Sequence, residues 1–289
     1  MKVLVLGVTG MLGSAVFKQM FNDSGYQVWG TLRSVSGLKY FSERAQEYLL
    51  SNIDVLEQDS LVAVLCKVRP DVVINCVGLI KQLSDVDDPL FALPINTMLP
   101  HRLSKLCSLA NARLIHISTD CVFNGRKGMY LEKDVSDAED LYGKSKYIGE
   151  LHDLPHTVTL RTSIIGHELN SNASLVNWFL TQTGSVKGYK RAIFSGLTTV
   201  ELANVIKELV IPNKNLQGLY HVSVEPIDKY TLLNLIADVY GKKIEIQADE
   251  QVQIDRSLDS SKFRRETGYK PPSWPQLIEK MHKVNQGIE

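Results

Sequence analysis

Short apolar runs alternate with longer segments of helical period through the first half of the chain. The apolar runs are rich in valine, isoleucine and leucine and end at glycine or polar residues, which is typical of strands buried in a parallel sheet. We expect strands at residues 3–6, 27–31, 71–75, 114–117 and 157–160. We expect helices at residues 11–21, 94–110 and about 142–151. The alternation predicts an α/β fold with a doubly wound parallel sheet of the Rossmann type.

The pattern becomes less regular beyond residue 165. We expect helices near residues 175–181, 199–210, 230–240 and 274–284, joined by short strands such as 218–222. The chain is therefore divided into a dinucleotide-binding domain, residues 1–165, and a smaller α/β lobe, residues 166–289, that mainly binds substrate. Some segments of the second part are expected to return to the first domain. A ligand site between the two parts is the expected geometry.

Composition limits the classes of partner. Thirty-two basic and 32 acidic side chains cancel among 289 residues, so no overall field attracts the chain to nucleic acid or to an anionic membrane. No apolar run approaches the roughly 20 residues of a membrane-spanning helix. The four cysteines lack the spacing of a metal or redox pair, which favours reduced thiols in a cytoplasmic protein. No third ligand joins His152 and His156, so we expect no metal. A homodimer is compatible with the sequence.

A glycine-rich turn directly follows the first expected strand. Gly7, Gly10 and Gly13 are spaced Gly-x-x-Gly-x-x-Gly and open the helix at residues 11–21. Glycine allows a sharp turn and a close approach of phosphate to the backbone, while free N–H groups at the helix start attract the anion. We expect this turn, including Thr9, Met11 and Leu12, to bind the pyrophosphate of a dinucleotide.

The end of the second expected strand indicates which dinucleotide is bound. NAD-binding proteins usually have an acidic residue there for the ribose 2′-hydroxyl, and this stretch has none. Arg33, with Ser34 beside it, can instead contact a 2′-phosphate, because the planar guanidinium fits phosphate geometry. The sequence predicts NADPH, with NADH as the alternative if Arg33 is only a solvated loop charge.

Tyr142 and Lys146 are four residues apart on an expected helix, so their side chains lie on one face. A phenol has an ordinary pKa near 10, and a neighbouring ammonium stabilises its anion and lowers that pKa. The pair can therefore move a proton, although Tyr-x-x-x-Lys by itself is a common pattern.

A third element makes the pair informative. Ser118 and Thr119 end the expected strand at 114–117, and the arrangement resembles that of the short-chain dehydrogenases. In those enzymes the hydroxyl at this place hydrogen-bonds the substrate oxygen and orients it against the tyrosine. The resemblance implies this role for Thr119, with Ser118 as a residue that shares or replaces it.

More extended motifs resemble the dTDP-4-dehydrorhamnose reductase family of extended short-chain dehydrogenases, over nearly the whole chain. They are the segments 118–125, 142–150, 160–162, 196–199, 256–260 and 268–274. The resemblance implies NADPH-dependent reduction of a 4-keto-6-deoxy sugar that is still linked to its nucleoside diphosphate. It implies that Tyr142 protonates the oxygen on C4 and that Lys146 holds the nicotinamide ribose.

The same resemblance implies further contacts. Asp54 would accept the adenine amine, although an exposed turn aspartate is the alternative. Val77 and Gly78 would allow the backbone to approach the cofactor ribose. Asn96 would lie near the active site, with a partly buried helix amide as the alternative.

Substrate contacts in the second part of the chain have weaker support. Asn177 and Trp178 stand where related proteins place substrate-facing residues, Lys187 belongs to a short basic cluster, and Arg256 is a candidate for the diphosphate. Cys121 stands where tyrosine is usual in the enzymes that make dTDP-rhamnose. Base and sugar therefore stay open between dTDP-4-dehydrorhamnose and a UDP-linked 2-acetamido-2,6-dideoxy-4-ketohexose.

Two other functions are compatible with these residues. A nucleotide-sugar epimerase would keep NADP tightly bound and return its hydride, and a regulatory subunit would bind the dinucleotide without catalysis. Retention of Thr119, Tyr142 and Lys146 together favours an enzyme that reduces a ketosugar for surface-polysaccharide synthesis.

Overall fold

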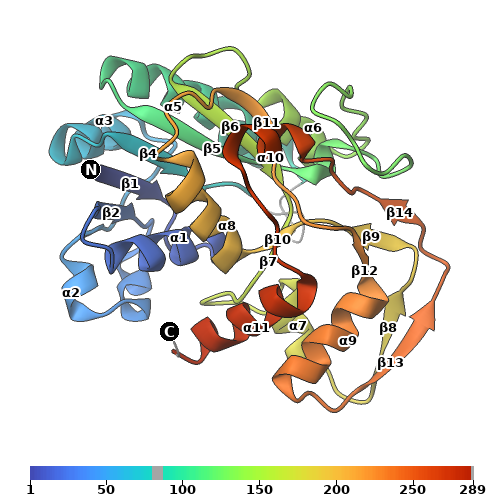
Figure 1. Cartoon of the computed structure of the whole chain (residues 1–289). Coiled ribbons are helices and arrows are strands. Elements are labelled where there is room, and N and C mark those ends of the chain that lie inside the picture. The colour runs from blue at the N-terminus through green and yellow to red at the C-terminus, as the bar shows by residue number, and fades with distance from the viewer. Residues whose placement is uncertain (80–86, 288–289) are drawn as a thin grey trace.

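A seven-stranded parallel sheet forms the centre of the protein (Figure 1). The computed structural model describes residues 1–79 and 87–287. The strand order is β11-β6-β5-β4-β1-β2-β3, and every neighbouring pair is parallel. The strands are β1 (Lys2–Leu6), β2 (Gln27–Thr31), β3 (Leu49–Leu50), β4 (Val72–Asn75), β5 (Arg113–Thr119), β6 (Thr157–Thr162) and β11 (Gly218–His221). The α/β fold of the Rossmann type expected from the sequence is confirmed.

The strand order reverses between β1 and β4, and this places the ligand site. The chain runs from β1 outward to β2 and β3 on one side, and from β4 outward to β5 and β6 on the other. In open parallel sheets, ligands bind beyond the carboxyl ends of the strands at such a reversal. The Gly7 turn and the segment after Asn75 both leave the sheet at this point.

Both faces of the sheet are buried because alternate residues point to opposite sides. Val3 and Val5 pack in the larger apolar cluster, with α1 and the second part of the chain, whereas Leu4 and Leu6 pack in the cluster formed with α3 and α5. All four side chains are at most 1% exposed. This two-sided burial explains why β1 reads as a continuous apolar run.

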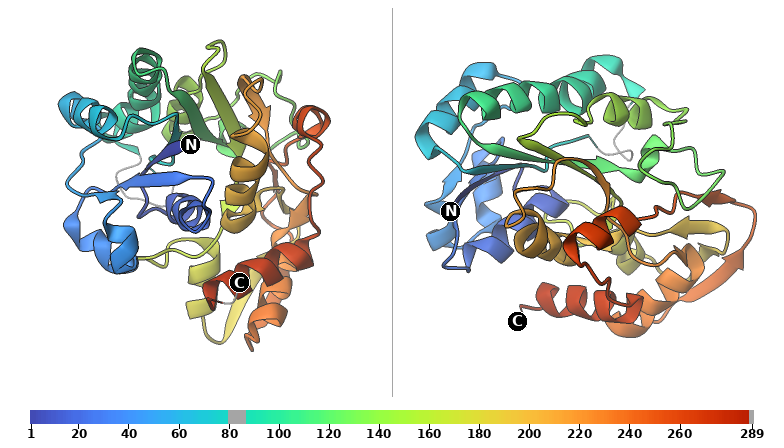
Figure 2. Two further views of the ribbon diagram at one scale, coloured as in Figure 1. Left: turned by 60° about the vertical axis from the view of Figure 1, so that its left-hand side comes forward. Right: turned by 45° about the horizontal axis from the view of Figure 1, so that its top comes forward.

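Helices cover the two faces, with α3 and α5 on one side and α1 and α8 on the other (Figures 1 and 2). The helices of the first part are α1 (Met11–Phe21), α2 (Glu43–Gln46), α3 (Gln58–Val68), α4 (Pro89–Ala92), α5 (Leu99–Leu109) and α6 (Leu141–Ile148). Short 3-10 helices are η1 (Val35–Tyr40) and η4 (Asp120–Val122).

The helix expected at residues 94–110 has a different course. It begins earlier, with α4, continues as the π-helix η3 (Leu93–Met98), and becomes α5 at Leu99. Pro94 and Pro100 each lack a backbone N–H, so a regular hydrogen-bond ladder cannot run through both positions. The wider turn lets the backbone of Asn96 approach Gly149, where a Cβ would lie 2.0 Å from the Asn96 carbonyl oxygen.

The second part of the chain builds small sheets and returns to the large one. It contains β7 (Ile164–Ile165), β8 (Ser185–Tyr189), β9 (Ala192–Phe194), β10 (Leu197–Thr198), β12 (Ile227–Asp228), β13 (Glu245–Asp249) and β14 (Ile254–Asp255). Its helices are α7 (Leu175–Thr181), α8 (Thr199–Val205) with the π-helix η5 (Ile206–Val210), α9 (Lys229–Tyr240), α10 (Ser261–Thr267) and α11 (Trp274–Asn285). Within residues 1–79 and 87–287, no helix has the length and apolar character needed to span a membrane.

A buried ion pair joins α6, β5, β6 and β11 inside this fold. Arg161 donates from Nε and Nη2 to the two carboxylate oxygens of Glu150, at 2.8 and 2.6 Å. Ser118 Oγ donates to Glu150 at 2.6 Å, and Arg161 Nη1 lies 3.0 Å from His221 Nε2. Burial alone raises the pKa of Glu150, but the hydrogen bonds from Arg161, His152 and Ser118 and the charge of Arg161 outweigh burial and lower that pKa to about 2.

Arg161→Met is expected to destabilise the protein by about 3–5 kcal/mol, because it leaves the Glu150 carboxylate buried and unpaired. The free energy of unfolding in urea at pH 7 measures this loss. The double variant Arg161→Met with Glu150→Met should lose less than the two single losses added together, and an additive result would contradict the pairing.

The same network predicts an acid-dependent stability. Because the pKa of Glu150 in the fold lies below its ordinary value of 4.5, the stabilisation is complete above pH 4.5 and is lost as the pH falls toward 2. The free energy of unfolding of the Glu150→Gln variant should fall less between pH 4.5 and pH 3 than that of the wild type.

Candidate functional site

The glycine turn after β1 has the close backbone packing that a phosphate-binding turn requires. Gly7 has a φ of 81°, which is strained for other residues, and a Cβ on Gly13 would lie 2.2 Å from the Gly7 carbonyl oxygen. Gly10 is the N-cap of α1 and contributes no capping side chain. The first N–H groups of α1, on Met11 and Leu12, therefore lack an intrahelical acceptor and are suited to an anion.

Residues near the ends of β2 and β3 surround this turn. The methyl group of Thr9 contacts the short helix η1, since a Cβ on Gly37 would lie 2.6 Å from Thr9 Cγ2. Arg33 is exposed at the end of β2, with no ion-pair partner among the described residues, and is thus open to a phosphate. Ser34 Oγ caps η1 by accepting from the Ser36 N–H at 3.3 Å.

Asp54 forms a local turn. Its Oδ1 accepts from the N–H of Leu56 at 2.9 Å, and the side chain is exposed. This geometry agrees with the alternative of a turn aspartate, and a carboxylate oxygen can still accept a second hydrogen bond. Contact between Asp54 and an adenine stays a prediction.

The turn after β4 connects the glycine turn to the proposed catalytic pair. Val77 Cγ2 would contact a Cβ on Gly7 at 2.9 Å, and a Cβ on Gly78 would lie 3.8 Å from Lys146 Nζ. Gly7, Val77, Gly78 and Lys146 therefore meet at one end of the sheet, although they come from β1, β4 and α6.

Lys146 is buried, with only 5% of its surface exposed. Its Nζ donates to the carbonyl oxygen of Ile117 on β5 at 2.8 Å. Burial lowers the pKa of Lys146 to about 8, while the nearby Glu150 and Cys76 oppose that shift. Lys146 therefore keeps its charge at neutral pH, with donor capacity left for a bound ligand.

Tyr142 lies near the end of β5, because α6 packs so closely on the turn after Thr119 that a Cβ on Gly143 would lie 2.2 Å from the Cys121 carbonyl oxygen, and Thr119 influences the Tyr142 pKa. Thr119 Oγ1 also donates to Asp120 at 3.2 Å and accepts from the N–H of Cys121 at 3.1 Å, which orients the hydroxyl. Asp140 caps α6 through the Gly143 N–H at 2.7 Å, so the helix begins just before Tyr142.

The electrostatics of the phenol differ from the sequence expectation. Burial raises the pKa of Tyr142, with smaller contributions from Cys121 and Asp120, and the Thr119 hydrogen bond opposes the shift. Lys146 is not among the groups that shift the Tyr142 pKa, so the lowered pKa that we expected is not found. The raised pKa keeps the phenol protonated at neutral pH and makes it a weaker acid.

Asn96 connects the turn after β4 to helix α6. It is buried, its Oδ1 accepts from the N–H of Leu79 at 3.0 Å, and its Nδ2 donates to Ser145 Oγ at 3.2 Å. Ser145 lies between Tyr142 and Lys146 in the sequence. Asn96 thus fixes the position of the helix that bears the pair, and its amide is occupied within the protein.

Three of the expected substrate contacts have partners within the protein. Ser118 points toward α6 and donates to Glu150, because alternate residues of β5 face opposite sides of the sheet. Asn177 is occupied by its own loop, donating to Glu168 at 3.3 Å and Ser171 at 3.0 Å. Lys187 pairs with Asp249 at 2.9 Å across the β8–β13 ribbon. Each of these three side chains has a partner within the protein, and its contact with a substrate stays a prediction.

Two other candidates from the second part remain accessible. Arg256 Nε donates to the carbonyl oxygen of Phe123 at 2.7 Å, and the Arg256 charge acts on Asp120 beside Thr119. Trp178 is 38% exposed on α7. The structure therefore brings Arg256 to the turn that follows Thr119. Contact of Trp178 with a substrate stays a prediction.

Sequence reasoning missed the residues whose hydrogen bonds and charges hold or influence the residues of the site. Glu150 and Arg161 form the buried pair described above, and the charge of Asp120 acts on the pKa of Lys229 at the start of α9. One signal was available for Lys229: a lysine in the first turn of a helix opposes the helix dipole, which is unusual without a functional reason.

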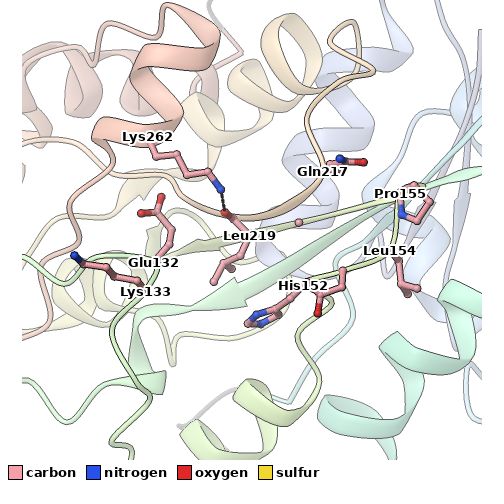
Figure 3. A pocket seen from close by; sticks show the side chains of 10 residues that line it. Glu132, Lys133, His152, Leu154, Pro155, Gln217, Leu219 and Lys262 are labelled. Atoms are coloured by element: carbon pink, nitrogen blue, oxygen red, sulfur yellow. Dashed lines mark hydrogen bonds between the residues drawn. The ribbon is translucent and has the colours of Figure 1, made fainter.

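A cavity of about 570 Å³ lies elsewhere, at the edge of the sheet beside β11 (Figure 3). Glu132, His152 and Lys262 are among its lining residues, and Thr119, Tyr142 and Lys146 are not. His152 bonds to Glu150 and His156 Nε2 bonds to the Ser104 carbonyl. Across residues 1–79 and 87–287, no group of three metal-ligating side chains is found.

Comparison with known proteins adds to this geometry. The chain is 30% identical over 254 residues to a methionine adenosyltransferase 2 subunit beta from Danio rerio, covering 83% of this chain and 74% of that protein. It is 24% identical over 301 residues to a dTDP-4-dehydrorhamnose reductase from Aggregatibacter actinomycetemcomitans, covering 96% and 97%.

A solved dTDP-4-dehydrorhamnose reductase from Bacillus anthracis, in complex with NADP, has the same fold. Its TM-score is 0.80 at 21% identity, covering 98% of this chain and 99% of that one. The family model described as RmlD substrate binding domain matches residues 1–286. Because this match spans both the glycine turn and the second lobe, the chain belongs to the RmlD substrate binding domain family.

Proposed function

We propose that this protein is an NADPH-dependent reductase of a 4-keto-6-deoxy sugar linked to a nucleoside diphosphate. The observation that carries the proposal is the meeting of Thr119, Tyr142 and Lys146 beside Gly78, at the sheet end that the glycine turn also faces. The dTDP-linked and UDP-linked sugars are both candidates. We also propose a cytoplasmic location, in keeping with the balanced charge.

The residues present fit a dinucleotide. A Cβ at Gly13 would meet backbone, so this close turn accepts only glycine, and the uncapped start of α1 offers N–H groups to a pyrophosphate. Arg33 would bind a 2′-phosphate, and Lys146 would bind the ribose near the nicotinamide. The cofactor supplies the hydride when it is bound.

The chain's own groups handle the proton. Thr119 would hold the substrate oxygen, because its hydroxyl lies at the end of β5, near Tyr142. Tyr142 donates its proton to that oxygen as charge develops there, since an alkoxide is more basic than a phenolate.

A second candidate function is favoured by the relatives named methionine adenosyltransferase 2 subunit beta, a subunit of another enzyme. Purified protein, NADPH and a panel of dTDP- and UDP-linked 4-keto-6-deoxy sugars separate the possibilities. The reductase should consume one NADPH per sugar reduced. Product without net oxidation would indicate an epimerase, and no reaction with any sugar would favour the subunit.

Tyr142→Phe is expected to lower kcat about 10²–10⁴-fold, because it removes the proton donor and keeps the ring. The Kd for NADPH, measured by fluorescence titration, should change little. Tyr147→Phe, on the exposed face of the same helix, is the matched control and should keep full activity. Activity retained in Tyr142→Phe would refute the assignment of the proton donor.

Arg33→Ala is expected to reduce the preference for NADPH over NADH about 10- to 100-fold, since one charge-assisted contact to the 2′-phosphate is lost. The ratio of kcat/KM for the two cofactors measures the preference, and the value for NADH should stay nearly constant. Lys39→Ala on η1 removes a nearby exposed charge as a control. An unchanged ratio would mean that Arg33 is a solvated loop charge.

A further inference from the structure

A buried amide joins the turn after β4 to a histidine on β5. Asn75, the last residue of β4, accepts through Oδ1 from the N–H of Val77 at 3.1 Å. Its Nδ2 lies 3.1 Å from Nδ1 of His116, the residue paired with Asn75 in the β4–β5 register. Asn75 and His116 are both 0% exposed. The turn at Val77 and Gly78 is therefore connected to His116 through a single side chain.

The amide determines which nitrogen of His116 carries the proton. Because Asn75 Oδ1 accepts from Val77, the end of the amide that faces His116 is its NH₂ group, which can only donate. His116 Nδ1 must then accept, so the ring proton is on Nε2. Burial, followed by the charge of Lys146, holds the pKa of His116 well below its usual range, and the ring stays neutral at neutral pH.

The second nitrogen of this ring carries a free-energy cost. His116 Nε2 is buried and has no hydrogen-bond partner among the residues that the structure describes. A buried donor without an acceptor is unfavourable, and an apolar side chain on this strand would avoid the cost. The reason for an imidazole at this place must therefore be sought at Nδ1, the atom that faces Asn75.

We propose that His116 is a positioning residue for the dinucleotide, because its Nδ1 fixes the Asn75 amide in the one orientation that holds the Val77–Gly78 turn. This inference rests on the proposed function, since it requires a dinucleotide bound against that turn. With the amide reversed, an NH₂ group would face the Val77 N–H, and the turn would lose its acceptor. A Cβ on Gly78 would lie 3.8 Å from Lys146 Nζ, so displacement of the turn would also change the space beside the lysine.

Two substitutions of His116 separate its positioning role from its packing. His116→Leu removes the acceptor and should raise the Kd for NADPH about 3- to 10-fold, the loss expected for one neutral hydrogen bond. His116→Asn should keep the Kd within about twofold of the wild type, because an amide oxygen can replace Nδ1 as the acceptor. Both variants lose ring contacts, and unfolding in urea should show that both are less stable than the wild type. Fluorescence titration measures the Kd.

A double-mutant cycle shows whether His116 acts through Asn75. In an Asn75→Leu background, adding His116→Leu should change the Kd for NADPH less than twofold, because the amide that it orients is already gone. His156→Leu is the matched control. His156 Nε2 bonds to the Ser104 carbonyl of α5 at 2.8 Å, so this variant loses an imidazole contact without touching the amide and should keep the wild-type Kd.

Amide hydrogen exchange of the protein without cofactor gives an independent readout. The Val77 N–H should exchange about 3- to 10-fold faster in His116→Leu than in the wild type, since its acceptor is no longer held in place. The Leu79 N–H is held by Asn96 Oδ1 at 3.0 Å and should keep its rate. Equal acceleration at both amides would indicate general loosening and would overturn the inference.

The outcomes are distinguishable from those of the proposed function. Equal weakening of NADPH binding in His116→Leu and His116→Asn would overturn the positioning role, as would full additivity with Asn75→Leu. Wild-type protein that binds no NADPH would refute the positioning role together with the reductase. The expected pattern of Kd values in a protein that reduces no ketosugar would support His116 while refuting the reductase.

Discussion

The buried pair of Glu150 and Arg161 holds together the parts on which the site depends. Its carboxylate lies at the end of α6, its guanidinium lies on β6, and Ser118 brings the end of β5 into the same set of hydrogen bonds. The neighbouring residues of β5 lie at the candidate site, since Ile117 accepts from Lys146 and Thr119 influences the Tyr142 pKa. Loss of the pair would remove one of the contacts that hold β5 near α6.

A buried ion pair is a poor source of net stability, because desolvation of both ions offsets their attraction. This pair also has an electrostatic effect that an apolar pair could not have. Glu150 places a permanent negative charge near Lys146, and that charge opposes the effect of burial on the Lys146 pKa. The fold can therefore bury a lysine against the sheet and keep it charged at neutral pH, which suits its proposed contact with the cofactor ribose.

The two parts of the chain contribute different chemistry to one place. The first part supplies the glycine turn and Thr119 at the carboxyl ends of β1 and β5, and helix α6 supplies Tyr142 and Lys146. The second part brings Arg256 to the turn after Thr119, where its Nε donates to the Phe123 carbonyl oxygen and its charge lowers the pKa of Asp120 against the effect of burial.

The sequence by itself determined the α/β class and the glycine turn, because these follow from local periodicity and from backbone space that only glycine provides. It also determined that Tyr142 and Lys146 share a helix face, since four-residue spacing fixes this in any α-helix. The sequence could not show which residues of a strand face which side of the sheet. Ser118 and Thr119 look equivalent in the sequence, yet the pleat of β5 directs one into the Glu150 network and the other toward Tyr142. The pairing of Lys187 with Asp249 and the contact of Arg256 with Phe123 were decided only by tertiary structure, because they join segments far apart in the chain.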